Sequence, residues 1–280
     1  MKLTRRVLSF AAVAIITATL LLLSSTSPTA AKGKPGGGGN TNFAFVFEDP
    51  DKGLFLTTVD DTNRVQLTRA AGRTHHIEPR WSPDLEDETP GYQGMIAYTE
   101  VNVDSFNALY VVNSDGSGNR ILTDRVGSGI AWTPNGKEIV LPQFNRRIVA
   151  VEVATGNLRV IWDNVDNTGP SIQHIAISPL GQLAFNRDGD IFVVDYSVDA
   201  DGLIELDPTT VVNTTSADTW ETAPSFSPDG TYLAYSQLLG PDADWQVVVL
   251  DLLAFEEIVV LEELSGDRRI TWSPDGSQIG

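Results

Sequence analysis

Eight polar residues stand in the short segments that precede Ser-Pro or Thr-Pro pairs along this chain. All three histidines of the sequence belong to this set. The full set is His75, His76, Glu78, Gln173, His174, Glu221, Asp267 and Arg269. Imidazole and carboxylate groups bind divalent cations, and guanidinium and amide groups bind anionic or polar ligands. These residues form one site only if the fold brings their segments together.

Two interpretations of this set stay open. The residues bind a ligand, with a divalent cation as one alternative, or they are polar side chains that hydrate a channel entrance. We assign no catalytic residue, expect no cofactor apart from that cation, and leave a metal ligand set unspecified. The Gly-x-Ser-x-Gly elbow of many hydrolases does not occur in the sequence.

A second candidate for cation binding is the acidic segment 197–204. Its alternating oxygen-bearing side chains and Gly202 imitate the start of a calcium-binding loop. Ser197 stands where such a loop begins with Asp, and Pro208 stands where it ends with Glu. An acidic hairpin turn explains the segment equally well.

The Ser/Thr-Pro pairs themselves belong to a fivefold repeat. A large apolar residue precedes each pair, and a turn residue follows. The five copies are Trp81–Asp84, Trp132–Gly136, Ile177–Gly181, Phe226–Gly230 and Trp272–Gly276. They lie 51, 45, 49 and 46 residues apart by their numbering, and such a period is typical of propeller blades.

Each part of the repeat has a mechanical role. Proline ends a strand and presets φ for a tight turn, and Asn-Gly or Asp-Gly supplies the positive φ of a hairpin. An apolar second strand follows the turn, for example at 138–141 and 232–235. A third strand comes next, for example at 108–112 and 190–194 in other repeats. A fourth strand, as at 119–123, completes a four-stranded blade. The polar candidates would then gather at one mouth of a central channel.

Residues 109–132 resemble the TolB-like, WD40-like β-propeller repeat family: Leu-Tyr-Val-Val-Asn-Ser-Asp-Gly-Ser, then Arg-Ile-Leu-Thr, then Trp-Thr-Pro-Asn-Gly. The resemblance covers nearly everything from Asn42 to Gly280. It implies a propeller fold and is compatible with binding proteins, peptidase accessory domains and some metal-dependent lyases. Because the glycine-rich segment leads directly into the first blade, we expect no counterpart of the α/β domain that precedes the propeller in TolB.

The fold class that we predict is all-β, a five-bladed propeller of four-stranded blades spanning residues 42–280. The first segments of the propeller are predicted to be strands two to four of one blade, at 43–47, 54–59 and 64–68. The last segment, 269–273, is predicted to be a lone first strand. We expect the two ends to pair and to close the ring, which leaves no bare edge. The alternative is a truncated six-bladed propeller.

The N-terminus predicts export. Basic residues Lys2, Arg5 and Arg6 precede an apolar run at 7–23 and small residues at 24–31, the layout of a signal peptide over residues 1–31. An uncleaved anchor is the alternative, and both the general secretory and the twin-arginine routes stay open. The glycine-rich segment 32–41 reads as a flexible linker.

Charge and cysteine content narrow the choice of partners. The formal net charge is −18, and removal of residues 1–31 takes away three basic residues and no acidic one, which leaves −21. Such a surface disfavours nucleic acid. The absence of cysteine excludes disulfides and thiolate chemistry.

We therefore expect a monomeric, extracytoplasmic module, periplasmic or secreted, that binds a protein, small molecule or saccharide of the cell envelope and does not span the membrane after signal cleavage. The alternative is a metal-dependent lyase or hydrolase acting on an anionic saccharide at the channel mouth.

Overall fold

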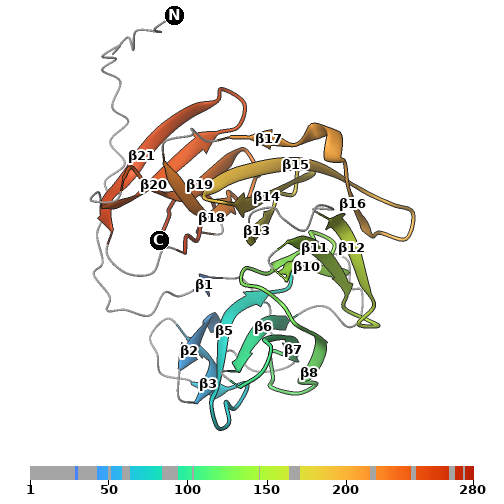
Figure 1. Ribbon diagram of the computed structural model, residues 1–280. Helices are drawn as coiled ribbons and strands as arrows, with labels where there is room; N and C mark the ends of the chain where they lie inside the picture. Colours follow the sequence, from blue (N-terminus) through green and yellow to red (C-terminus); the bar gives the residue numbers. More distant parts are fainter. Residues whose placement is uncertain are drawn as a thin grey trace, which may run out of the picture.

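The computed structural model describes residues 29–30, 43–49, 52–58, 64–83, 94–102, 104–144, 146–163, 171–214, 219–240, 244–264, 269–273 and 275–280. In these residues the chain forms five antiparallel sheets that are arranged as the blades of a β-propeller (Figure 1). The only helical element among them is a single 3₁₀ turn, Pro208–Thr210. The prediction of an all-β, five-bladed propeller is confirmed.

Each blade is a four-stranded meander in sequence order. Blade 1 contains β1 (Thr29–Ala30), β2 (Phe43–Asp49), β3 (Gly53–Thr58) and β4 (Val65–Gln66). Blade 2 contains β5 (Thr74–Trp81), β6 (Met95–Asn102), β7 (Ala108–Asn113) and β8 (Arg120–Asp124). Blade 3 contains β9 (Ala131–Trp132), β10 (Glu138–Gln143), β11 (Arg147–Glu152) and β12 (Leu158–Asp163).

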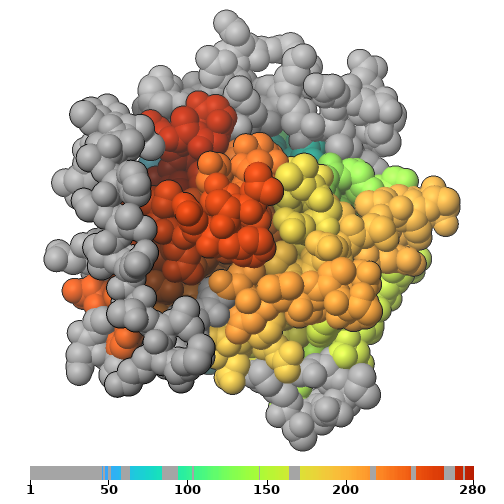
Figure 2. Space-filling view, turned by 90° about the horizontal axis from the view of Figure 1, so that it is seen from above, coloured from blue at the N-terminus to red at the C-terminus, as the bar shows by residue number. Residues whose placement is uncertain are grey.

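The last two blades follow the same order. Blade 4 contains β13 (Ile172–Ile177), β14 (Gln182–Arg187), β15 (Asp190–Val198) and β16 (Ile204–Leu206), and β17 (Val212–Asn213) also pairs with β15. Blade 5 contains β18 (Trp220–Phe226), β19 (Tyr232–Leu238), β20 (Trp245–Asp251) and β21 (Glu256–Leu264). Figure 2 shows blade 5, in orange to red, lying against the yellow-to-orange residues of blade 4.

The turns of the repeat form as the sequence predicts. The glycine of the turn has a positive φ, between 67° and 87°, in four copies of the repeat: Gly136, Gly181, Gly230 and Gly276. In the turn of blade 5, the Gly230 N–H donates to the carbonyl of Ser227 over 2.9 Å, and the Ser227 hydroxyl donates to Asp229 over 2.6 Å. The hydrogen bond from the Ser227 hydroxyl, with those from the Thr231 N–H and hydroxyl, holds the pKa of the exposed Asp229 carboxyl below its usual value.

The core consists of apolar clusters between successive blades. Neighbouring residues of one strand serve opposite interfaces, since their side chains alternate across the sheet. Ile139 and Leu141 of β10 pack toward blade 2, whereas Val140 packs toward blade 4. Corresponding clusters fill the interfaces of blade 1 with blade 2 and of blade 4 with blade 5. All three named side chains are fully buried, so the sheet of blade 3 is stabilised from both faces.

The predicted closure of the ring is corrected in one respect. The strand that pairs with β2 is β1, through Thr29 opposite Val46 and Ala30 opposite Phe45, and not the segment 269–273. That segment folds back on the C-terminus instead, because the turn at Asp275 and Gly276 lets Thr271 and Gly280 exchange two backbone hydrogen bonds of 2.9 and 3.0 Å. The C-terminus still lies near blades 5 and 1 (Figure 1).

β1 lies inside the predicted signal peptide, so cleavage after residue 31 would remove this strand from blade 1. The expectations for the N-terminus stay predictions. Residues 1–28 and 31–42, which hold nearly all of the predicted signal peptide and linker, lie outside the described residues. Within the described part of the chain, no helix has the length and apolar character required to cross a membrane.

Candidate functional site

The first strands of successive blades lie side by side: β5 contacts β9, β9 contacts β13, and β13 contacts β18. Each carries a backbone irregularity three residues before its apolar signature residue. At this position Glu78, Gly129, His174 and Ala223 all have positive φ, between 49° and 88°. The pairing registers shift at the same place in β5, β13 and β18, which is the mark of a β-bulge. Two of the predicted site residues, Glu78 and His174, therefore occupy equivalent positions.

Hydrogen bonds connect these bulges from blade to blade. The Glu78 N–H donates to Glu48 Oε1 of blade 1 over 2.6 Å, and Glu78 Oε2 accepts from the Gly129 N–H of blade 3 over 2.7 Å. The His174 N–H donates to the Ser128 carbonyl over 3.2 Å. Together with the contacts of His174 and Glu48 described next, these bonds form a series that we call the inter-blade belt. Its members are Glu48, Glu78, Ser128, Gly129, His174, Thr222 and Arg269.

The belt continues through blade 5 and the C-terminal segment. His174 Nδ1 lies 3.0 Å from the Thr222 hydroxyl of β18. Arg269 Nη1 lies 3.2 Å from Glu48 Oε1, an ion pair that joins the C-terminal segment to blade 1. The Trp272 indole N–H donates to the Ser225 carbonyl over 3.0 Å, which joins the same segment to blade 5. Arg269 thus contributes to closing the ring.

Other predicted site residues lie in different surroundings. His76 is only 3% exposed, between the Thr68 hydroxyl at 2.6 Å and Glu100 Oε2 at 3.1 Å. Burial lowers the pKa of His76, although the hydrogen bond that its ring makes to the Glu100 carboxylate opposes the shift. His75 beside it is exposed.

Glu221, another predicted site residue, lies in the interior of blade 5. The Glu221 side chain is fully buried and accepts hydrogen bonds from the Thr219 hydroxyl and, over 3.3 Å, from Gln237. Asp267 lies outside the described residues. Within the described part of the chain, no three histidine or acidic side chains cluster in the manner of metal ligands.

Gln173 belongs to a pocket of about 450 Å³ that sequence reasoning did not anticipate. Three blades contribute to it, because the linker after β8 crosses from blade 2 toward blade 3 and β13 of blade 4 begins beside it. The lining residues are Ser105, Phe106, Asn107, Arg125, Val126, Gly127, Ser128, Phe144 and Gln173.

Backbone hydrogen bonds fix the floor of this pocket. The Val126 N–H donates to the Asn107 carbonyl over 3.2 Å, and the Gly127 N–H donates to the Pro142 carbonyl over 2.8 Å. Ser128, next along the linker, belongs to the inter-blade belt. The pocket therefore rests directly on the hydrogen bonds that hold blades 2, 3 and 4 together.

The rim of the pocket presents aromatic rings and a cation. Phe106 and Phe144 are 60% and 52% exposed, which is unusual for phenylalanine. The Arg125 guanidinium lies over the Phe106 ring, 4.7 Å from its centre. Arg125 and Phe144 both have positive φ, of 59° and 52°, a costly conformation for residues with a side chain that concentrates at functional sites. The one sequence signal for this rim was Phe106, an aromatic residue within the otherwise polar segment 104–107.

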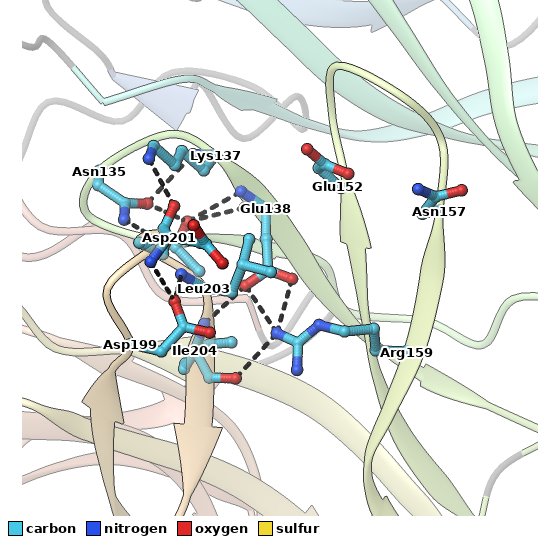
Figure 3. A network of polar contacts seen from close by, with 12 residues as sticks. Asn135, Lys137, Glu138, Glu152, Asn157, Arg159, Asp199, Asp201, Leu203 and Ile204 are labelled. Atoms are coloured by element: carbon cyan, nitrogen blue, oxygen red, sulfur yellow. Dashed lines mark hydrogen bonds and ion pairs between the residues drawn. The ribbon is translucent and has the colours of Figure 1, made fainter.

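The calcium-like segment forms the β15–β16 hairpin, and a lysine approaches its turn (Figure 3). Asp199 Oδ1 accepts the N–H groups of Asp201 and Leu203 over 2.9 and 2.8 Å, as in an ordinary turn. The Lys137 ammonium of blade 3 donates to the Asp201 carbonyl over 2.6 Å. A cationic side chain therefore already contacts the hairpin, which favours the acidic-turn interpretation.

The same hairpin docks on a buried ion pair (Figure 3). Arg159 Nη2 lies 2.9 Å from Glu138 Oε1, and the Glu138 side chain is only 1% exposed. Glu138 Oε2 accepts the Ile204 N–H over 2.7 Å, and Arg159 donates to the Ile204 carbonyl over 2.9 Å. This network is a structural contact between blades 3 and 4.

Comparison with known proteins gives likeness at the level of the fold. No protein-family model matches the chain, and no curated protein matches it in sequence. Among solved structures, TolB from Acinetobacter baumannii is 16% identical with a TM-score of 0.62, over 83% of this chain and 53% of TolB. The protein assigned as TolB from Agrobacterium tumefaciens is 18% identical with a TM-score of 0.63, over 90% of this chain and 88% of its own.

An oligogalacturonate lyase in complex with manganese is also similar, at 14% identity and a TM-score of 0.54, over 90% of this chain and 76% of the lyase. This chain spans about half the length of the first of these TolB structures. Identities this low show a shared architecture and do not transfer a function. The chain has the β-propeller fold that the TolB structures also have.

Proposed function

We propose that this chain is an extracytoplasmic binding module whose ligand, a protein or small molecule of the cell envelope, docks on the face that carries the 450 Å³ pocket. The predicted signal peptide and the likeness in fold to TolB support this proposal. A concave site with aromatic walls and a few polar groups is the usual form of a ligand site.

The observation that carries the proposal is the composition of the pocket. Its side chains are two phenyl rings, one guanidinium, hydroxyls and amides. Such groups hold a ligand by stacking and hydrogen bonding, whereas acid–base catalysis calls for a histidine or carboxylate within reach of the reacting bond. The lining therefore favours binding.

Topology supplies the control surface for a test. The pocket is formed by β6–β7 and β10–β11 loops and by segments that enter the first strands, all at one end of the sheets. The Ser/Thr-Pro turns join first to second strands at the opposite end, where Leu180 is 63% exposed. Leu180 and Phe144 are thus exposed apolar residues on opposite faces.

The experiment places a photo-cross-linking amino acid at Phe144 in one variant and at Leu180 in another, in the full chain expressed in a Gram-negative host. We expect a discrete adduct in the cell-envelope fraction with the probe at position 144 and none at position 180. Equal labelling from both faces, or adducts at position 180 alone, would show that the pocket face is not the docking surface.

The lyase alternative rests on the likeness in fold to the manganese-bound oligogalacturonate lyase. Its direct test is metal analysis of the purified chain after incubation with Mn²⁺ and removal of the unbound ion. Stoichiometric manganese that is lost in a His76→Ala, His174→Ala double variant would favour the lyase over the binding module.

A further inference from the structure

Arg125 is a cation without an acidic partner among the described residues. Five other basic residues of this strongly acidic chain do form ion pairs in the part that the structure describes: Lys52 with Asp49, Arg73 with Asp104, Arg147 with Asp163, Arg159 with Glu138 and Arg269 with Glu48. The contact that the structure gives the Arg125 guanidinium is with the face of Phe106. Its N–H groups are therefore available to an anion in the pocket.

The backbone holds Arg125 in this position. β8 ends at Asp124, and the positive φ of Arg125 turns the chain so that Val126 and Gly127 run across to Asn107 and Pro142. Stacking on Phe106 further restricts the guanidinium. An arginine ordered in this way loses less side-chain entropy when it binds a carboxylate, for which its planar N–H groups are complementary.

The other residues that line the pocket match the part of a ligand that lies next to such a carboxylate. Phe106 and Phe144 offer apolar surface, and Ser105, Asn107 and Gln173 offer neutral donors and acceptors. Neutral amide and hydroxyl groups match the polar atoms of a peptide main chain. One cation matches one carboxylate, whereas a polymer with an acid on every unit would be repelled by a chain of formal charge −18.

We propose that this pocket binds the C-terminal end of a polypeptide, with the terminal carboxylate on Arg125 and the last apolar side chain against Phe106 and Phe144. The inference rests on the proposed function and specifies its ligand. A volume of about 450 Å³ lies within the range of roughly 300–1,000 Å³ that holds compact ligands.

The test is affinity selection with a pool of hexapeptides of varied last three residues, each made as the free acid and as the C-terminal amide. We expect the full chain to retain free acids about tenfold or more over their amides, which corresponds to ~1.4 kcal/mol, and to prefer apolar last residues. The Arg125→Gln variant is expected to lose the preference for acids, and Phe144→Ala to retain less of both forms.

Arg187→Gln is the matched control, because Arg187 also lies over a phenylalanine ring, that of Phe192 at 5.8 Å, but does not line the pocket. It is expected to select as the unmodified chain does. Equal retention of acids and amides, retention of no peptide, or an acid preference that survives Arg125→Gln would each overturn the inference.

Some outcomes separate this inference from the proposed function. Peptides retained without regard to the terminal carboxylate, yet lost in Phe144→Ala, would overturn the ligand assignment and leave the pocket as a docking site. Retention of a trigalacturonate in a parallel selection, with no peptide retained, would assign the pocket to acidic saccharides instead. Retention of neither kind of probe, together with equal photo-cross-linking from both faces, would remove both proposals.

Discussion

At the scale of single residues, the belt depends on a position where only glycine fits. Gly129 has φ of 88°, and a methyl group at its Cα would lie 2.8 Å from the backbone nitrogen of His174 and closer still to the His174 Cα. The linker between blades 2 and 3 can therefore pass against blade 4 only without a side chain. The pocket floor and the belt share this close approach.

The Gly129→Ala variant is expected to lower the free energy of unfolding by ~3 kcal/mol, since the added carbon meets backbone atoms that cannot rotate away. Gly72→Ala is the control, because Gly72 has φ of 67° but nothing within 4 Å of its added carbon. It should cost only the conformational penalty of about 1 kcal/mol. Urea unfolding curves of both variants measure the difference, and equal losses would contradict the close approach.

His76 predicts a pH dependence of stability. Burial lowers its pKa in the folded state from the ordinary value of 6.5, against the opposing effect of Glu100, with His75 contributing to the lowering. The unfolded chain therefore binds the proton more tightly, so the stabilisation is fully present above pH 6.5 and decreases as the pH falls through 6.5 toward the lowered pKa.

Unfolding free energies at pH 7.5 and 5.5 test this linkage. The unmodified chain should lose more stability between the two pH values than the His76→Gln variant, which lacks the buried imidazole. His75 and His174 are present in both proteins and cancel in the comparison. An identical pH dependence in the two proteins would show that His76 titrates as an exposed histidine.

At the scale of elements, the β15–β16 hairpin is attached to blade 3 by a buried charge pair. Glu138→Gln removes the charge that Arg159 and the Ile204 N–H share. Breaking a fully buried pair costs about 3–5 kcal/mol, and the loss here should lie toward or below the lower end of that range, because the Arg159 side chain is 35% exposed. Asp163→Asn breaks the Arg147 ion pair, whose side chains are 44% and 40% exposed. Such surface pairs contribute only ~0–1 kcal/mol.

Thermal unfolding of the two variants should therefore show a large decrease in Tm for Glu138→Gln and little change for Asp163→Asn. Similar Tm values would show that the hairpin does not depend on the buried pair for its position.

The signature tryptophans connect neighbouring first strands. Trp132 donates its indole N–H to the Arg80 carbonyl of the preceding blade over 3.0 Å, as Trp272 does to Ser225. The Trp81 indole N–H is buried and has no partner among the described residues. A tryptophan therefore contributes a hydrogen bond in two signatures and buries an unsatisfied donor in a third.

This difference predicts unequal losses of stability for the same substitution at the two positions. Trp132→Phe should cost ~1–3 kcal/mol, since it leaves the Arg80 carbonyl without its buried donor. Trp81→Phe removes an unsatisfied donor and should cost less than Trp132→Phe by about 1 kcal/mol or more. Chemical unfolding monitored by far-ultraviolet circular dichroism measures both, and a greater loss for Trp81→Phe would contradict the assignment.

At the scale of the whole molecule, the propeller could be predicted from the sequence because its signal is local and repeated. Each Ser/Thr-Pro turn sets one hairpin, and the spacing of about 45–51 residues sets the blade. The same periodicity predicted that Glu78 and His174 gather at one mouth of the channel, and the structure gives both residues a positive φ at equivalent places. Both residues stand three positions before their signature residues.

The pocket could not be predicted in the same way. Its side chains come from irregular loops of three blades, and Arg125 and Phe144 reach the rim through positive φ at residues that usually avoid it. The pairing of β2 was also missed, since a strand as short as Thr29–Ala30 carries no periodic signal. The pocket lining and the pairing of β2 depend on contacts between residues that are far apart in the sequence, which residue types alone do not reveal.

The closed ring depends most on the proximity of blade 1 and the C-terminal segment, which the ion pair of Glu48 and Arg269 joins. The chain has no cysteine, so a Glu48→Cys, Arg269→Cys double variant can be treated with a short bismaleimide that joins only the two new thiols. The control is a Glu48→Cys, Thr155→Cys double variant, in which the second thiol lies on blade 3. The closed ring predicts an intramolecular cross-link between the peptides that contain positions 48 and 269, and none in the control. Failure of the 48–269 pair to cross-link in the folded chain would contradict the ring.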